Sequence, residues 1–230
     1  YDPVRQYRTL PLTPATAPFK QDVYTIQPYF KAKFGPVSMQ GELNYAFGER
    51  DYETDLVDDQ DINSLSAWLD ADANFGMFSV GGSLAYVQGD DDPNEINNQL
   101  TGGRDWNPCL IMNNNNMFYT WVGGIAGNTG TGTVDGELNN VIFGHVRGSV
   151  TPIPQLTAGM SLSYAQADED FGGDNDKGFE VDITGTYKIT NNLSYMLGVG
   201  YLKTGDFYKG ETDADLDDDY VVLNKLTLSF

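Results

Sequence analysis

Charged side chains of both signs recur at every second position in several stretches that are otherwise rich in Ser, Thr, Asn, Gln and Gly. Alternate positions of an extended chain point to the same side, so these side chains would share one wall. Rings of charged side chains along a polar passage select the ions that cross it. We expect the wall of such a passage to carry Lys31, Lys33, Glu42, Asp70, Asp72, His145, Arg147, Glu180, Asp182 and Lys188. The simpler interpretation is that these charges only neutralise one another in a polar interior.

Acidic residues between these stretches offer oxygen ligands for a cation. Asp213, Asp215 and Asp217 have the every-second-residue spacing of a calcium loop. However, Asp218 stands where an EF-hand has Gly, and no Glu follows at the expected place. Acidic runs are usually solvated and mutually repulsive. Calcium in these connections is therefore the one metal hypothesis, and no other cofactor is expected.

A single histidine limits the hydrolytic chemistry that the chain could perform. His145 would have to serve as the base for a nucleophile such as Ser161 or Ser163 in the next stretch. Composition alone would place two serines there, so we expect a protein that is not an enzyme.

The one cysteine, Cys109, cannot form an internal disulfide. An excess of 33 acidic over 13 basic residues argues against nucleic-acid binding.

The elements that would position these side chains follow a period of two, which predicts strands and not helices. Apolar residues occupy the positions opposite the polar ones. We expect nine strands, at 24–34, 37–47, 65–75, 78–86, 142–150, 156–164, 179–189, 193–201 and 220–230. Short turns alternate with long polar connections at 50–61, 89–137, 167–178 and 204–219, and residues 1–21 form an irregular segment.

The longest connection, 89–137, allows two interpretations. Residues 106–112 and 117–125 could be two further strands joined by a turn at 113–116, which would make eleven. Alternatively, the connection folds into the passage and narrows it, with Trp106, Tyr119 and Trp121 buried inside. The glycines at 123–124 and between 127 and 136 favour turns, and therefore the folded loop.

A soluble β-sandwich would also alternate, but the aromatic residues of the apolar face gather at the strand ends, as they do at the two interfaces of a membrane barrel. The last strand ends on the aromatic Phe230, after Leu226 and Leu228 on the same face. This strand resembles the closing strand of porin-like outer-membrane β-barrels of Gram-negative bacteria. The likeness covers residues 22–230 and depends on the strand and turn pattern. It extends loosely to the alginate-export-like porins, and Asn224 on the apolar side departs from it.

The resemblance implies an all-β fold, a transmembrane antiparallel up-and-down β-barrel in the bacterial outer membrane. It also implies passive diffusion of small hydrophilic solutes, contact with membrane lipid and lipopolysaccharide, long acidic loops outside the cell, and residues 1–21 outside the cell or in the lumen. A divalent ion bridging the loops to lipopolysaccharide is one reading of the acidic clusters. Oligomers remain open, and so do two other functions: a sheath around a partner such as a multihaem electron conduit, and surface interaction through the acidic loops.

The expected strand number is odd, whereas bacterial single-chain barrels have even numbers. We therefore expect these strands to form the carboxyl-terminal portion of a larger barrel, together with an amino-terminal segment that is absent here. The alternative is a natural chain whose first residues pair irregularly. Two extra strands within 89–137 would keep the number odd.

Overall fold

The computed structural model describes residues 17–90, 92, 94–97, 106–112, 140–170, 173–209 and 215–230. Almost all regular structure in these ranges is strand. The elements are β1 (Phe19–Ile26), β2 (Tyr29–Phe34), β3 (Val37–Tyr52), β4 (Gln60–Phe75), β5 (Phe78–Val87), β6 (Glu95–Ile96), β7 (Val141–Ile153), β8 (Leu156–Gln166), β9 (Asp176–Lys188), β10 (Leu193–Thr204), the 3-10 turn η2 (Asp206–Lys209) and β11 (Asp219–Leu228). No helix of the described residues is long and apolar enough to span a membrane.

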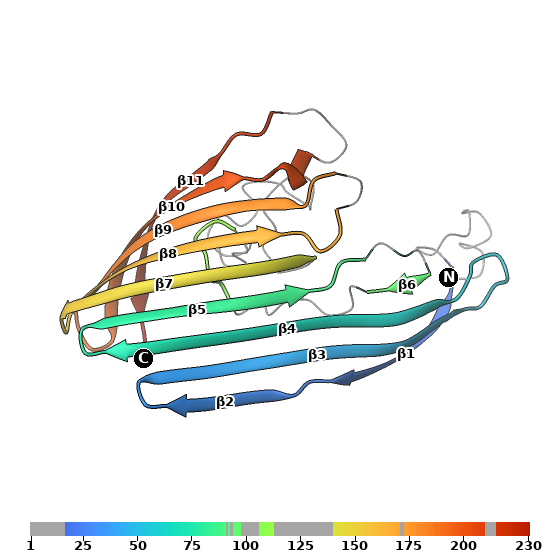
Figure 1. Ribbon diagram of the computed structural model, residues 1–230, viewed down its shortest axis with the longest axis horizontal. Helices are drawn as coiled ribbons and strands as arrows, with labels where there is room; N and C mark the ends of the chain where they lie inside the picture. Colours follow the sequence, from blue (N-terminus) through green and yellow to red (C-terminus); the bar gives the residue numbers. More distant parts are fainter. Residues whose placement is uncertain are drawn as a thin grey trace.

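The strands form one sheet in the order β1-β3-β4-β5-β7-β8-β9-β10-β11, and every neighbouring pair on this path is antiparallel (Figure 1). β1 and β2 pair with successive parts of β3. Together they correspond to one expected strand, which is interrupted at Gln27 and Pro28. β6 adds only two residues, parallel to β4. The up-and-down antiparallel fold and the nine expected strands are therefore confirmed.

The sheet is eleven-stranded only because β1 and β2 are separate elements and β6 is counted. The alternative in which residues 106–112 form a strand is wrong, since these residues have no strand structure. Residues 117–125, the second half of that alternative, lie outside the described part of the chain.

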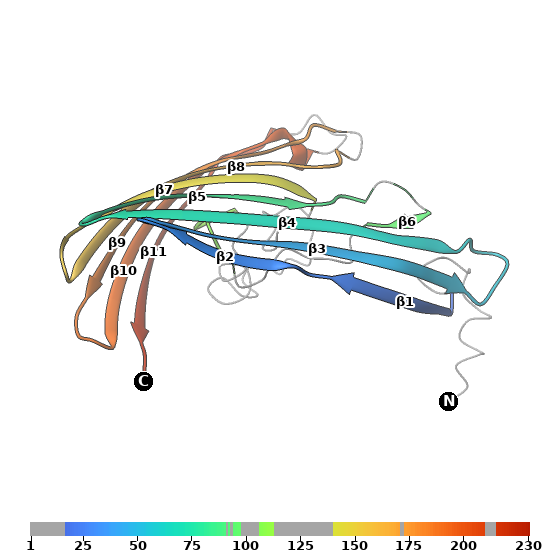
Figure 2. The ribbon, with the colours of Figure 1, turned by 60° about the horizontal axis from the view of Figure 1, so that its bottom comes forward.

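The sheet arches into a trough and remains open (Figure 2). Among the described strands, β11 pairs only with β10 at one edge, and β1 and β2 pair only with β3 at the other. The strands as described thus do not close into a barrel. Residues 106–112, which we call the inner segment, lie on the concave side of the arch (Figure 2).

The short turns and the long connections lie at opposite ends of the sheet, as expected. Gly35 and Gly76 adopt positive φ values of 58° and 67° in two of the turns, a conformation that glycine adopts without steric cost. At the other end, β3 and β4 extend further than the alternation indicated. Their pairing continues to Arg50 and Gln60, so the connection there comprises only residues 53–59. Pairing persists into this polar sequence because strand hydrogen bonds use the backbone, whatever the side chain.

Gly48 lies where β1 approaches β3 too closely for a side chain. A Cβ at this position would lie 1.9 Å from the backbone oxygen of Asp22. We expect Gly48→Ala to lower the free energy of unfolding by about 1–3 kcal/mol, because the strands must move apart. Urea unfolding of the protein in detergent micelles measures this change. Gly185→Ala is the control, since nothing lies within 4 Å of a Cβ there; equal losses in both variants would contradict the explanation.

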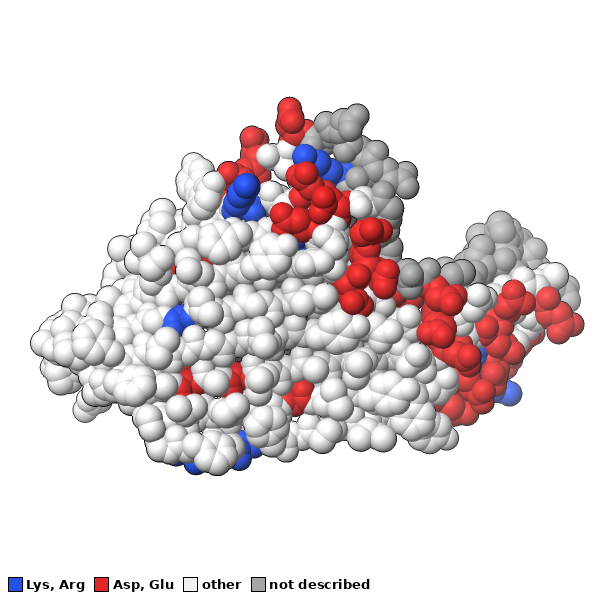
Figure 3. All heavy atoms as spheres, viewed as in Figure 1, with Lys and Arg blue, Asp and Glu red and all other residues white. Residues whose placement is uncertain are grey.

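The two faces of the sheet differ in polarity. Figure 3 shows a surface almost free of charge over the middle of the strands, with acidic side chains gathered toward the end that carries the long connections. Apolar side chains at alternate strand positions remain exposed, among them Leu84, Val146, Met160, Ile183, Leu197, Val222 and Leu226. Exposed aromatic residues stand near the strand ends, including Tyr24, Phe34, Phe75, Phe78, Tyr164, Tyr187 and Tyr220. A sandwich would cover such a face with a second sheet, and the described residues form only one.

Candidate functional site on the concave face

Most of the hydrogen bonds between the inner segment and β9 converge on one carboxylate. The backbone N–H groups of three consecutive residues, Leu110, Ile111 and Met112, donate to the side chain of Glu180 at 3.0, 2.7 and 2.6 Å. Leu110 N–H also donates to Asp182 at 3.2 Å. Successive N–H groups that converge in this way form a concave binding site for an anion. Because Glu180 is fully buried, these bonds replace the water that its carboxylate gives up.

Aromatic packing holds the other end of the inner segment. The ring of Trp106 meets those of Trp68 and Phe143 edge to face, with centroid distances of 5.7 and 5.6 Å. A small core forms between the segment and the wall, and it comprises Ala85, Val87, Cys109, Met112, Val141, Phe143, Ala165 and Leu202. The concave face is thus apolar and covered at this level.

The structure brings three of the predicted wall residues together around one guanidinium group. Arg147 on β7 donates to Asp70 at 2.8 Å and to Asp72 at 2.7 and 3.1 Å, and both acids lie on β4. The remaining Arg147 nitrogen donates to Ser83 at 2.9 Å. The three charged side chains stay partly exposed, at 30% for Arg147, 11% for Asp70 and 40% for Asp72. This cluster places charge where the wall meets solvent.

His145 lies next to this cluster, but its ring faces the buried hydroxyl of Ser163. Its Nδ1 is 2.8 Å from Ser163 Oγ, to which the thiol of Cys109 also donates at 3.1 Å. Ser163 is 2% exposed and lies beneath the inner segment. A nucleophile must reach its substrate, and this hydroxyl is closed off from solvent. Burial raises the pKa of the Cys109 thiol well above its usual value, and the charge of Glu180 adds to the increase.

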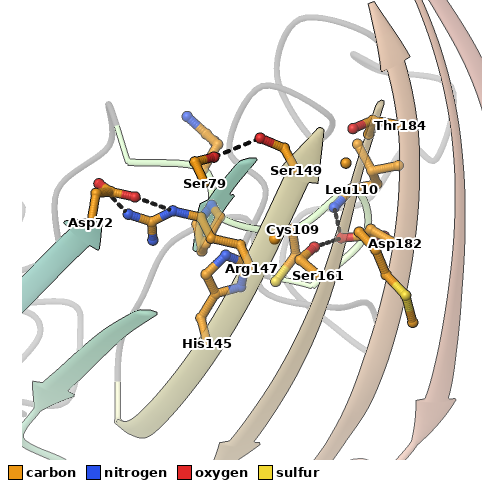
Figure 4. A pocket seen from close by; sticks show the side chains of 15 residues that line it. Asp72, Ser79, Cys109, Leu110, His145, Arg147, Ser149, Ser161, Asp182 and Thr184 are labelled. Carbon is orange, nitrogen blue, oxygen red and sulfur yellow. Dashed lines mark hydrogen bonds and ion pairs between the residues drawn. The ribbon is translucent and has the colours of Figure 1, made fainter. Parts of the chain in front are cut away.

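A cavity of about 410 Å³ lies between the Arg147 cluster and the inner segment (Figure 4). Its lining includes Asp72, Arg147 and His145 on one side and Cys109, Ser161 and Asp182 on the other. In Figure 4, Arg147 turns toward Asp72, while Asp182 meets Ser161 and Leu110. The cavity is thus bounded by polar side chains of both signs and by the inner segment.

The other predicted residues lie further from this cavity. Lys31 and Lys33 of β2 line a second cavity of about 510 Å³, together with Asp70 and Asp72. Glu42 is paired with Trp68 across β3 and β4, and Lys188 ends β9 beside the turn. Of the expected constriction residues, Trp106 lies on the concave face, whereas Tyr119 and Trp121 fall outside the described residues.

The calcium hypothesis concerns residues between η2 and β11. Asp215 and Asp217 precede β11, and the backbone oxygen of Asp217 accepts a hydrogen bond from Thr204 at 3.0 Å. Asp213 lies outside the described residues, so calcium binding there remains a prediction.

Cys109 is the functional candidate that sequence reasoning missed. From the sequence, Cys109 was described only as a cysteine that cannot form an internal disulfide. Its neighbours Ser163, Glu180 and Asp182 are between 54 and 73 residues away in sequence, so no local spacing could have revealed them.

Neither a protein-family model nor a curated protein matches the sequence. The solved structures that are similar to it include the following two. The outer-membrane expressed OmpT of Vibrio cholerae is 12% identical with a TM-score of 0.43, over 89% of this chain and 54% of that one. OccK2 (OpdF) of Pseudomonas aeruginosa is 13% identical with a TM-score of 0.43, over 91% of this chain and 50% of that one. The chain spans about half the length of each.

Proposed function

We propose that this chain contributes the strands of a bacterial outer-membrane barrel whose polar concave face conducts small hydrophilic solutes or ions. The observation that carries the proposal is the opposite polarity of the two faces: exposed Leu, Val, Ile and Met on one side, and the Arg147 cluster with its polar cavity on the other. A membrane barrel needs this arrangement, since one face meets lipid and the other meets water. The role needs no covalent chemistry.

The inner segment would narrow such a channel on one side of the lumen. The long connections would lie outside the cell, and their acidic residues would enrich cations at the mouth within about a Debye length. Planar-bilayer recording of the purified full-length protein tests the proposal. Discrete ohmic conductance steps are expected, and intact bilayer insertion without current would contradict conduction.

A pair of neighbouring substitutions tests whether the apolar face meets lipid. Ile183 is 58% exposed on the apolar face, and Thr184, the next residue of β9, lines the polar cavity. We expect Ile183→Lys to lower the stability of the protein in liposomes by about 2–4 kcal/mol, because the charge would lie in hydrocarbon. Thr184→Lys adds the same charge on the opposite face and should cost much less. Denaturant unfolding from liposomes measures both, and equal costs would exclude a lipid-facing role for Ile183.

A further inference from the structure

Two buried carboxylates on the concave face of β9 have no cationic partner. Glu180 is fully buried and Asp182 is 3% exposed. No ion pair joins either of them to a Lys or Arg in the described part of the chain. Hydrogen bonds from backbone N–H groups and from Ser161 compensate their burial only in part. Buried charges are normally paired with an opposite charge or coordinate a metal, so this pair calls for a proton or a cation.

The Cys109 thiol completes a set of possible ligands. One atom each from Cys109, Glu180 and Asp182 lies within 4.8 Å of the other two. Asp182 Oδ1 is buried and has no hydrogen-bond partner among the described residues. A Cβ at Gly200, opposite Asp182 on β10, would lie 2.7 Å from this oxygen, and glycine leaves that space open. Asp182 therefore retains an oxygen that can ligate.

The chemistry of the three groups selects the class of cation. A thiolate is a soft ligand that suits zinc and its relatives, whereas calcium and magnesium take oxygen ligands. Three protein ligands leave a fourth position of a tetrahedral zinc site for water. Cys109 and Asp182 also line the 410 Å³ cavity, which provides a route for the ion and room for that water.

We propose that Cys109, Glu180 and Asp182 form a binding site for one divalent cation of the zinc class, held between the inner segment and β9. Binding displaces the thiol proton, since the thiolate is the ligand. The ion then joins the inner segment to the wall at a second point, beside the N–H bonds to Glu180. The site is independent of solute conduction and can be measured in detergent, without a membrane.

Cobalt(II) titration of the folded full-length chain tests this site, because a thiolate bound to cobalt gives a charge-transfer absorption that carboxylates alone do not give. We expect one equivalent to produce this absorption and zinc to abolish it by displacement. Cys109→Ser should remove it. Asp182→Asn should weaken binding at least about tenfold, the lower limit for losing a group that supports a metal site.

Asp217→Asn removes an acid from the connection before β11 and should leave the absorption unchanged, which separates the site from general cation binding by acidic loops. Circular dichroism confirms that each variant retains its strands. The proposal is overturned if the folded wild-type chain gives no thiolate absorption. It is also overturned if Asp182→Asn binds as tightly as the wild type, because the thiol alone would then capture the ion.

Discussion

Replacing Glu180 by alanine should free the inner segment and raise the rate at which N-ethylmaleimide modifies Cys109 by at least about tenfold. In the intact protein Cys109 is 2% exposed, and its thiol has a raised pKa, so modification requires the segment to open. Three hydrogen bonds to the Glu180 side chain hold it closed. Each such bond contributes about 0.5–1.5 kcal/mol, so the loss of all three exceeds the roughly 1.4 kcal/mol that shifts an equilibrium tenfold.

The control must distinguish the loss of the hydrogen bonds to Glu180 from the loss of its charge, because removing a negative charge also lowers the pKa of the Cys109 thiol. Asp182→Asn is suitable. Asp182 likewise raises the pKa of Cys109, yet it accepts only one N–H of the segment, at 3.2 Å. Mass spectrometry after timed quenching gives both rates, in metal-free buffer. A similar acceleration in the two variants would show that charge, and not the fastening by Glu180, controls access to Cys109.

Replacing Arg147 by glutamine should make the proposed channel more cation-selective and reduce the stability of the protein. The substitution leaves Asp70 and Asp72 facing the cavity region without their shared cation. Breaking a fully buried pair costs about 3–5 kcal/mol and an exposed pair contributes about 0–1 kcal/mol. The partial exposure of these side chains places the expected loss between them, at about 1–3 kcal/mol.

Reversal potentials in a KCl gradient give the selectivity, and denaturant unfolding gives the stability. Lys33→Gln is the matched control, since it removes one positive charge from the same face but breaks no ion pair observed in the described residues. Adding Asp70→Asn and Asp72→Asn to Arg147→Gln should restore much of the lost stability, because the unpaired acids are then gone. Equal effects of Arg147→Gln and Lys33→Gln would mean that the Arg147 cluster has no special role.

Much of the fold could be predicted because a strand shows its two faces in sequence. The alternation of Ile183 with Thr184 or of Val146 with Arg147 is local and survives in the structure. Strand ends were less predictable. β3 and β4 continue through charged residues because backbone pairing depends little on side-chain polarity there.

The site was predictable only in part. Asp70, Asp72 and Arg147 were expected on one wall, but sequence could not show that a single guanidinium group binds both acids, since 75 residues separate Arg147 from Asp72. Glu180 and Asp182 were expected on the wall of a polar passage. The structure instead covers them with the inner segment, because three backbone N–H groups need an acceptor once they leave water.

By itself, then, the sequence determined the strand period, the face on which each side chain lies and the excess of acid in the long connections, since these are properties of neighbouring residues. Only the tertiary structure decided that Trp106 to Met112 lie against the inner wall and that Cys109 meets two acids of β9. Those contacts join residues between 37 and 73 positions apart in sequence, and they form because the arch of the sheet brings β9 beneath a connection that leaves β5.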